Sequence, residues 1–427
     1  MQDIYDVLVV GGGFSGAIAA IAAARCGART LLVEQYGFLG GMLTAAGVGP
    51  MMTFHAGETL IVRGIADEVI QRLQRKGLSP GHIFDTTGYT YTVTPFDAEG
   101  LKTELEEMAL EAGVELLYHT MLADVQVESG DIASVQLCSK AGLFRVRAKV
   151  YVDATGDADV AHLCGVPWEK GREKDGRCQP MTLCFRMAGV DKARVPNRDA
   201  INALYDEAKA EGLVHNPRED VLFFDTLHED VLHFNTTRVL NVDPVNVDDV
   251  TRAEQEAREQ VFEMVRFLKE RVPGFANAYL QRTAALTGAR DSRRIEGQYK
   301  LTWMEVLAQA RYPDAICRFA YMIDVHSPDG AGTERRYLPE GGYYEIPFRC
   351  LVPKRIENLL VAGRTISADH KAQSSLRVMP ACTAMGQAAG LACARFLRTR
   401  TPFAKMNGEK LHRLLVEAGA MPERAED

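Results

Sequence analysis

Several charged side chains in the second half of the sequence are of types that bind and activate small polar molecules. Arg290, Arg293 and Arg294 stand in the stretch RDSRR, and a guanidinium group matches the paired oxygens of a carboxylate or the oxygen of a carbonyl. We expect Arg290 and Arg294 to point inward and to act on a substrate. The alternative is a structural cluster of ion pairs in which these arginines meet Asp291 and Glu296.

Two histidines are candidate proton acceptors, His326 and His370. Asp324 and His326 follow a predicted apolar strand at residues 320–323, and side chains two apart in an extended chain lie on the same side. His370 lies between Arg364 and Arg377. An imidazole titrates near neutral pH, so it can take a proton from a hydroxyl group or from carbon. For His326 the alternative is a loop histidine paired with a neighbouring carboxylate.

The cysteines indicate neither a metal site nor a redox-active pair. The nine cysteines are scattered from Cys26 to Cys393 and include no C-x-x-C pair and no tight Cys/His cluster. A zinc site, a redox-active dithiol and an iron–sulfur cluster all lack their spacing. We therefore expect free thiols and no metal.

The first 34 residues predict one strand–helix–strand unit that binds a dinucleotide. An apolar strand at 6–10 runs into GGGFSG, whose Gly11, Gly13 and Gly16 form G-x-G-x-x-G. A helix of small residues at 17–26 and a second strand at 30–33 follow and deliver Glu34. The glycines allow a tight turn, close approach of a pyrophosphate and close helix packing, and Glu34 is placed to bind a ribose. Because an acid there disfavours a 2′-phosphate, the dinucleotide is FAD or NAD.

Two further pieces favour FAD over NAD. An apolar strand at 150–153 runs into ATGD, and another at 358–362 leads to a glycine turn. A helix is predicted over 381–397, after Pro380, and its Gly386 and Gly390 leave one face bare. The N-terminus of such a helix, directed at the N1/C2=O edge of a flavin, would favour negative charge on the ring.

These pieces resemble the family called FAD-dependent oxidoreductases, flavoproteins of the glutathione-reductase type in the branch that includes fumarate reductase and L-aspartate oxidase. The matching motifs run from GGMLT at 40–44 through CQPMT at 178–182, RDSRR at 290–294 and IPFRCLVP at 346–353 to GQAAG at 386–390. One departure is conservative, since the family often shows RETRR where this chain has RDSRR. The resemblance implies an α/β fold, with a Rossmann-like FAD-binding domain of glutathione-reductase type assembled from both ends of the chain and an inserted α+β substrate domain.

The resemblance also implies FAD as cofactor and hydride transfer between a small polar organic substrate and flavin N5. The strand near 121–127 is expected to pass the adenine. The residues expected to contact FAD are Gly11, Gly13, Phe14, Ser15, Gly16, Glu34, Gln35, Gly41, Met42, Thr44, Asp124, Val125, Ala154, Thr155, Gly156, Gly363, Arg364, Arg377, Met379 and Ala381. Two alternatives stay open, an NAD-dependent dehydrogenase that uses the first motif alone and a flavin-binding subunit of a larger complex without turnover of its own.

The domain organisation and partners follow from the same patterns. We expect the FAD-binding domain to comprise 1–165 and 355–427 and the substrate domain 166–354, with an amphipathic helix over 250–272. No second strand–GxGxxG–helix unit follows. The electron donor or acceptor is left open, and so is the formation of a homo-oligomer. The net charge of −8 argues against nucleic acid. The acidic start lacks a signal-peptide pattern and no apolar run is long enough to span a membrane, so a cytoplasmic protein is expected.

Overall fold

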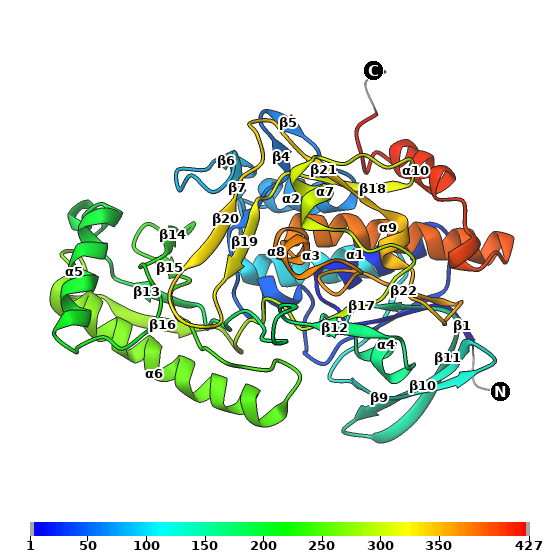
Figure 1. The fold of residues 1–427 in the computed structure, drawn as a ribbon, viewed down its shortest axis with the longest axis horizontal. Helices are drawn as coiled ribbons and strands as arrows, with labels where there is room; N and C mark the ends of the chain where they lie inside the picture. Colours follow the sequence, from blue (N-terminus) through cyan, green and yellow to red (C-terminus); the bar gives the residue numbers. More distant parts are fainter. Residues whose placement is uncertain (1–3, 424–427) are drawn as a thin grey trace.

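The structure, a computed structural model, describes residues 4–423. Its largest sheet (Figure 1) contains five parallel strands in the order β8-β2-β1-β11-β22. These strands are β1 (Ile4–Val10), β2 (Thr30–Val33), β8 (Glu115–Leu117), β11 (Gly142–Asp153) and β22 (Leu359–Val361). Strands β1 and β2 are apolar and buried where they pair, as expected for a parallel sheet covered on both faces. The expected α/β fold with a Rossmann-like core is confirmed.

Four of the parallel strands end together at one edge of the sheet. Val10 at the end of β1 pairs with Val33 of β2 on one side and with Asp153 of β11 on the other. Asp153 in turn pairs with Val361 of β22. The segments that follow these strands therefore leave the sheet side by side, and ligands of open α/β sheets bind at this carboxyl edge.

An antiparallel meander extends the sheet beyond β11. It consists of β9 (Met121–Glu128), β10 (Asp131–Ser139) and the first half of β11, with Val135 facing Val146 in one pair and Val125 in the other. Helix α3 (Ala98–Glu111) precedes β8. The strand expected near residues 121–127 is confirmed as β9.

Helices α1 (Phe14–Arg25) and α9 (Met379–Thr399) pack against each other at the centre of the molecule (Figure 1). Every residue of α1 from Phe14 to Ala24 is buried, and eight of these residues are glycine, alanine or serine. A Cβ atom added to Gly386 would overlap the backbone oxygen of Ser15, and one added to Gly390 would overlap that of Ala19. The two helices approach so closely because these positions lack side chains.

Both central helices are longer than predicted. Helix α1 begins at Phe14 rather than at residue 17, so the third glycine of the motif lies inside the helix rather than before it. Helix α9 begins at Met379, and a separate helix α8 (His370–Leu376) precedes it. The carboxylate of Asp369 caps α8 by accepting a hydrogen bond from the Ala372 backbone nitrogen (2.7 Å).

A second unit lies to one side of this core (Figure 1). Its antiparallel sheet has the order β14-β15-β13-β16, and its helices are α5 (Arg198–Ala210) and α6 (Val247–Arg271). The strands are β13 (Phe185–Ala188), β14 (Phe223–Asp225), β15 (Leu232–Phe234) and β16 (Tyr279–Thr283). The predicted amphipathic helix is confirmed as α6, which packs its apolar face into a core separate from that of the large sheet.

Hairpins join the two units. The hairpin of β19 (Ile323–His326) and β20 (Thr333–Arg336) places Asp324 and His326 inside a strand, so the strand predicted at 320–323 is wrong. Residues 320–322 link strand β18, which pairs with β21, to strand β19, which pairs with β20. The other elements are β3 (Met51–Met52), β4 (His55–Ala56), β5 (Thr59–Leu60), α2 (Ile65–Arg75), β6 (Ile83–Phe84), β7 (Thr92–Thr94), α4 (Asp159–Leu163), β12 (Trp168–Lys170), β17 (Arg293–Ile295), α7 (Trp303–Leu307), β18 (Ala315–Phe319), β21 (Tyr344–Pro347) and α10 (Gly408–Glu417).

The domain boundaries placed at 165 and 355 stay a prediction. Apolar residues between Leu301 and Val352 pack into the same core as α1 and α9, whereas the separate core of the second unit draws its residues from between Met181 and Ala278. Among residues 4–423, no helix is both long and apolar enough to cross a membrane.

The close contact of α1 with α9 predicts that Gly386→Ala destabilises the fold. The added methyl group meets backbone rather than a movable side chain, so we expect a loss of about 1–3 kcal/mol in the free energy of unfolding. Thermal unfolding of the two proteins measures it. Gly100→Ala is the matched control, because the atoms nearest to its added methyl group belong to the Leu78 side chain, whose Cδ1 at 2.6 Å can move aside, rather than to backbone. Equal melting temperatures for wild type and Gly386→Ala would contradict the prediction.

Candidate functional site

The three glycines of the G-x-G-x-x-G motif are explained by different physical constraints. Gly11 has φ +99°, and a Cβ atom there would overlap the Ala154 backbone oxygen. A Cβ atom on Gly16 would overlap the Gly11 backbone oxygen. At Gly13, by contrast, the nearest atom to an added Cβ is the Gly41 Cα at 3.9 Å, and φ is −57°. The protein's own packing thus requires the first and third glycines, whereas Gly13 borders open space.

The N-terminus of α1 faces this space without a protein cap. Its N-cap residue Gly13 has no side chain, and its first turn holds no acidic residue. The hydroxyl group of Ser15 is buried and has no hydrogen-bond partner among the described residues. Unpaired N–H groups, a free hydroxyl group and the positive end of a helix dipole together make a site for a phosphate group.

Glu34 follows β2 at the carboxyl edge of the sheet. One carboxylate oxygen accepts a hydrogen bond from the Gly12 nitrogen (2.6 Å), and the other accepts one from the Tyr36 nitrogen (2.9 Å). Burial raises the pKa of Glu34 above its ordinary value, although these backbone N–H groups oppose the shift. Glu34 and Gln35 line a groove of about 530 Å³ beside the end of α1.

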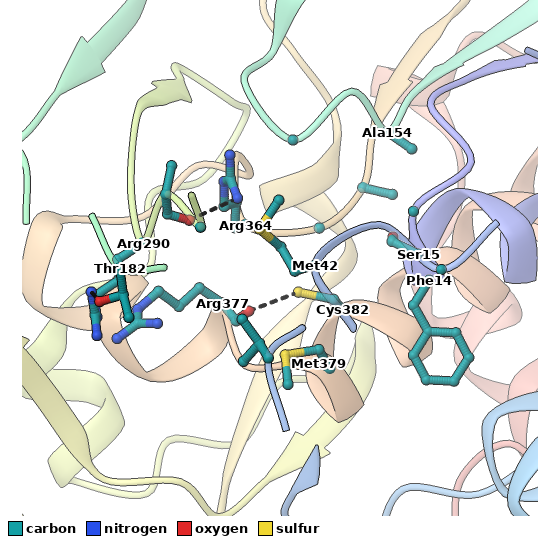
Figure 2. A pocket seen from close by; sticks show the side chains of 18 of the residues that line it. Phe14, Ser15, Met42, Ala154, Thr182, Arg290, Arg364, Arg377, Met379 and Cys382 are labelled. Atoms are coloured by element: carbon teal, nitrogen blue, oxygen red, sulfur yellow. Dashed lines mark hydrogen bonds between the residues drawn. The ribbon is translucent and has the colours of Figure 1, made fainter. Parts of the chain in front are cut away.

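Three hollows adjoin one another, and the first two border the carboxyl edge of the sheet. The groove shares Gly13, Met42 and Arg364 with a central cavity of about 160 Å³. The central cavity (Figure 2) shares Asn235, Arg290 and Arg377 with a chamber of about 110 Å³. Such a continuous path suits an elongated cofactor whose reactive end meets a substrate.

Most of the residues expected to contact the cofactor border the groove or the central cavity. They are Gly11, Gly13, Phe14, Ser15, Glu34, Gln35, Gly41, Met42, Ala154, Thr155, Gly156, Gly363, Arg364, Arg377 and Met379. The structure places Gly16, Thr44, Asp124, Val125 and Ala381 outside both linings. Thr44 instead donates a hydrogen bond from its hydroxyl group to the Leu39 oxygen (2.8 Å), which closes the turn around Gly40.

On β9 the groove lining begins earlier than the sequence suggested. Thr120, Met121 and Leu122 border the groove, whereas Asp124 and Val125 do not. The alternating pattern of a strand does not determine its first residue to better than a few positions. The register between β9 and β10 determines which residues reach the groove.

The chamber gathers charged side chains from distant parts of the chain. Asp324 lies at its centre, with Oδ2 3.2 Å from His326 Nε2 and 3.7 Å from an Arg377 nitrogen, and with Oδ1 3.4 Å from Arg335 Nε. Although burial opposes ionisation, these neighbours lower the pKa of Asp324 below its ordinary value. Arg218, Arg290, Arg335 and Arg377 all line the chamber, so its cations outnumber its carboxylate.

Arg290 lies between the central cavity and the chamber. Its guanidinium group donates to the Pro180 oxygen (2.6 Å) and to the Thr182 hydroxyl oxygen (2.7 Å), which fixes it next to Arg377 in the view of Figure 2. Burial, together with the positive charges of Arg377 and Arg218, lowers the pKa of Arg290 to about 9. The group is therefore still protonated at neutral pH, and it has no carboxylate partner among residues 4–423.

His326 is held in one neutral tautomer. Burial and the charge of Arg290 lower the pKa of His326 to about 3. Its Nδ1 lies 3.0 Å from an Arg238 nitrogen and accepts from that guanidinium group. Nε2 therefore carries the proton and donates it towards Asp324. The expected Asp324–His326 pairing is present, and its geometry makes the carboxylate, rather than the imidazole, the free acceptor.

Arg294 and His370, also expected in the site, lie apart from the chamber. Arg294 donates to the backbone oxygens of Gly171 (2.9 Å) and Ala368 (3.2 Å). His370 Nε2 lies 2.9 Å from a carboxylate oxygen of Asp291, and both residues are buried. Neither Arg294 nor His370 is among the residues that line the central cavity or the chamber. Their contacts join α8 to the RDSRR stretch.

Several chamber residues gave no signal in the sequence. Tyr89, Arg218 and Asn235 come from unremarkable loop segments. Arg335 is different, because it pairs directly with Asp324 across the β19–β20 hairpin. The Gly-containing turn between two short polar strands was the sequence signal that would have revealed that pairing.

The fold and the phosphate-binding loop define a dinucleotide-binding α/β protein. A family model described as FAD dependent oxidoreductase matches residues 6–415, and the chain belongs to that family. The cofactor is therefore FAD, and the protein is an oxidoreductase. This membership removes the NAD-dependent dehydrogenase as an alternative.

Comparison with other proteins gives partial matches. Thiamine thiazole synthase of Aeropyrum pernix is 34% identical over 190 residues, which cover 41% of this chain and 63% of that protein. Digeranylgeranylglycerophospholipid reductase of Methanocaldococcus jannaschii is 26% identical over 203 residues, 45% of this chain and 47% of the relative. The matches thus span less than two thirds of these curated relatives. A solved geranylgeranyl bacteriochlorophyll reductase-like protein of Thermoplasma acidophilum covers 98% of this chain, and the alignment spans 84% of that protein, at 15% identity with a TM-score of 0.48.

The open space beside Gly13 predicts a selective loss of cofactor binding. Gly13→Ala should fold like the wild type, because the nearest protein atom is 3.9 Å from the new Cβ and φ suits alanine. Its methyl group would occupy the space of the pyrophosphate, so FAD should bind at least about tenfold more weakly, roughly 1.4 kcal/mol. Titration of the apoprotein with FAD measures this.

Gly11→Ala provides the contrast, because its Cβ would overlap the Ala154 backbone and should lower the melting temperature of the apoprotein itself. A Gly13→Ala protein that binds FAD as tightly as the wild type would show that Gly13 does not border the cofactor.

Proposed function

We propose that the protein transfers a hydride between a small polar organic anion and N5 of its FAD. The observation that supports this most directly is the chamber, which opens onto the central cavity and presents Arg290, Arg335 and Arg377 around Asp324 and His326. A chamber with excess positive charge beside a flavin suits a carboxylate-bearing substrate.

In this proposal FAD would lie along the groove and the central cavity, and the chamber would hold the substrate. The adenosine ribose binds at Glu34, the pyrophosphate at the N-terminus of α1, and the isoalloxazine ring in the central cavity between Met42 and the start of α9. This is the arrangement of the glutathione-reductase type. Bound FAD supplies a two-electron centre that accepts or delivers a hydride at N5.

Arg290 and Arg377 hold the anionic group of the substrate in the proposed site. Arg290 keeps its orientation through the Pro180 and Thr182 oxygens, so little side-chain entropy is lost when a substrate binds. Arg377 and Arg335 contact Asp324, so an incoming anion competes with that carboxylate for their charge. Binding therefore raises the pKa of Asp324 and makes it a better base.

Asp324 is the proton acceptor in the proposed reaction. Its Oδ1 forms no hydrogen bond among the described residues, and Oδ2 is fixed by the Nε2–H group of His326. Arg238 and Thr333 hold the opposite nitrogen of His326, so the imidazole acts as a positioning group. Arg294 and His370 maintain the framework behind the chamber.

A panel of compounds tests the function. The FAD-loaded protein is mixed anaerobically with hydroxy acids, amino acids, sugars and amines, and its visible flavin absorbance is followed. We expect bleaching with a carboxylate-bearing compound and none with neutral sugars. Bleaching by neutral compounds only would contradict an anionic substrate. If no compound bleaches the flavin, the alternative of a flavin-binding subunit without turnover of its own is favoured.

Asp324→Asn tests the proton acceptor. The amide keeps the shape but cannot take the proton, so the rate of flavin bleaching by the active compound should fall by about 10²–10⁴-fold. Binding of the compound should become tighter, because the competing carboxylate charge is removed from Arg335 and Arg377, and FAD content should change little. Glu334→Gln is the matched control, because Glu334 lies on β20 and pairs with Lys371 and Arg336 outside the chamber. An unchanged bleaching rate in Asp324→Asn would exclude Asp324 as the base.

A further inference from the structure

A small recess continues the chamber on the side away from the central cavity. It shares Gly49, Pro50 and Phe224 with the chamber lining and holds about 30 Å³. A water molecule needs about 10–15 Å³ of such space, so the recess has room for a group about the size of a carboxylate. Its polar lining residues are Arg186, Asp225, Thr226 and His233, of which Arg186 and His233 can donate to an anion.

Arg186 and His233 face each other across neighbouring strands. They are directly paired in the antiparallel register of β13 and β15, so both side chains lie on the same face of the sheet. Arg186 makes no hydrogen bond and no ion pair with any residue from 4 to 423. His233 is 7% exposed, and both of its ring nitrogens lack a partner within the same part of the chain.

The two unpartnered ring nitrogens of His233 are buried, which is costly unless a ligand satisfies them, whereas Arg186 is half-buried. Burial, with the charges of Arg186 and Arg282, lowers the pKa of His233 to about 3, so its imidazole is neutral and offers one N–H donor. Arg282 is already engaged with Glu99 (3.1 Å). The only carboxylate in the recess lining, Asp225, is 81% exposed and pairs with Lys192 (2.8 Å). One guanidinium group and one neutral N–H donor thus remain for an anion.

We propose that this Arg186–His233 recess binds a second carboxylate of the substrate. The substrate then carries two acidic groups joined by a short chain, one held in the chamber by Arg290 and Arg377 and the other in the recess. This inference rests on the proposed function, because it takes the chamber as the reaction site. The chain between the two groups passes the lining that the two hollows share, at Gly49, Pro50 and Phe224.

A series of unbranched dicarboxylates tests the recess without turnover. Oxidised, FAD-loaded protein is titrated with the acids from malonate to suberate and with monocarboxylates of the same carbon number, and the perturbation of the flavin spectrum is followed. We expect one dicarboxylate length to bind at least about tenfold more tightly than its monocarboxylate, because a hydrogen bond to a charged group is gained. Arg186→Met should abolish that difference and leave monocarboxylate affinity unchanged.

Control variants separate the recess from general electrostatics. Arg282→Met removes a neighbouring cation that already has a partner, and it should keep the preference for the dicarboxylate. Arg186→Lys should restore part of the preference. FAD content and thermal unfolding show whether each variant is folded. Equal affinities for dicarboxylates and monocarboxylates, or an equal loss of both in Arg186→Met, would overturn the proposal.

Three further outcomes are informative. If inorganic phosphate raises the affinity for monocarboxylates and Arg186→Met removes this effect, the recess binds a separate anion, and the proposal of a second substrate carboxylate is wrong. If monocarboxylates bind and bleach the flavin but dicarboxylates show no advantage, the recess proposal fails while the proposed function stands. If no acid perturbs the flavin spectrum, both proposals fail.

Discussion

The contact between α1 and α9 is the constraint on which the site depends. One helix follows the first strand of the sheet and the other comes near the opposite end of the chain, and glycines allow their backbones to touch. The N-terminus of α1 and the residues that begin α9 thereby border one central cavity. A pair of larger side chains at the crossing would separate the helices and widen this cavity, so the geometry offered to a flavin is set by packing well away from the ring.

The chamber, which adjoins the central cavity on the side away from the groove, is characterised by its many positively charged side chains. The chamber brings together arginines from a loop, from the RDSRR stretch, from β20 and from the end of α8, and Asp324 is the one carboxylate in its described lining. The loop arginine, Arg218, is paired outside the lining with Asp220 (2.7 Å). Such an arrangement destabilises the empty protein through repulsion and desolvation. It persists because the guanidinium groups donate to fixed backbone and side-chain oxygens, as Arg290 does to Pro180 and Thr182. The arrangement lowers the stability of the protein without ligand, and it keeps the guanidinium groups in position to bind an anion.

The sequence predicted the parts of the fold that depend on local pattern. The strand–glycine–helix–strand unit, the helix α6 and the glycine face of α9 all appear, because their signals are periodicity and residue size. The chamber depends instead on the packing of distant segments. Nothing in the local sequence of Arg218 or Asn235 distinguishes them from surface residues, and His370 looked like a base until its pairing with Asp291 placed it behind the site. Hairpin register alone would have revealed Arg335.

The separation of α1 and α9 along the chain also orders events during synthesis. Helix α1 ends at Arg25 and its partner α9 begins at Met379, so α1 is synthesised well before the helix that covers it. At ordinary rates of translation the interval is on the order of tens of seconds. During that time the residues of α1 that are buried in the folded protein, Phe14 to Ala24, lack the helix that covers them, and the central cavity does not yet exist. The cofactor therefore cannot protect α1 from aggregation until α9 has been synthesised.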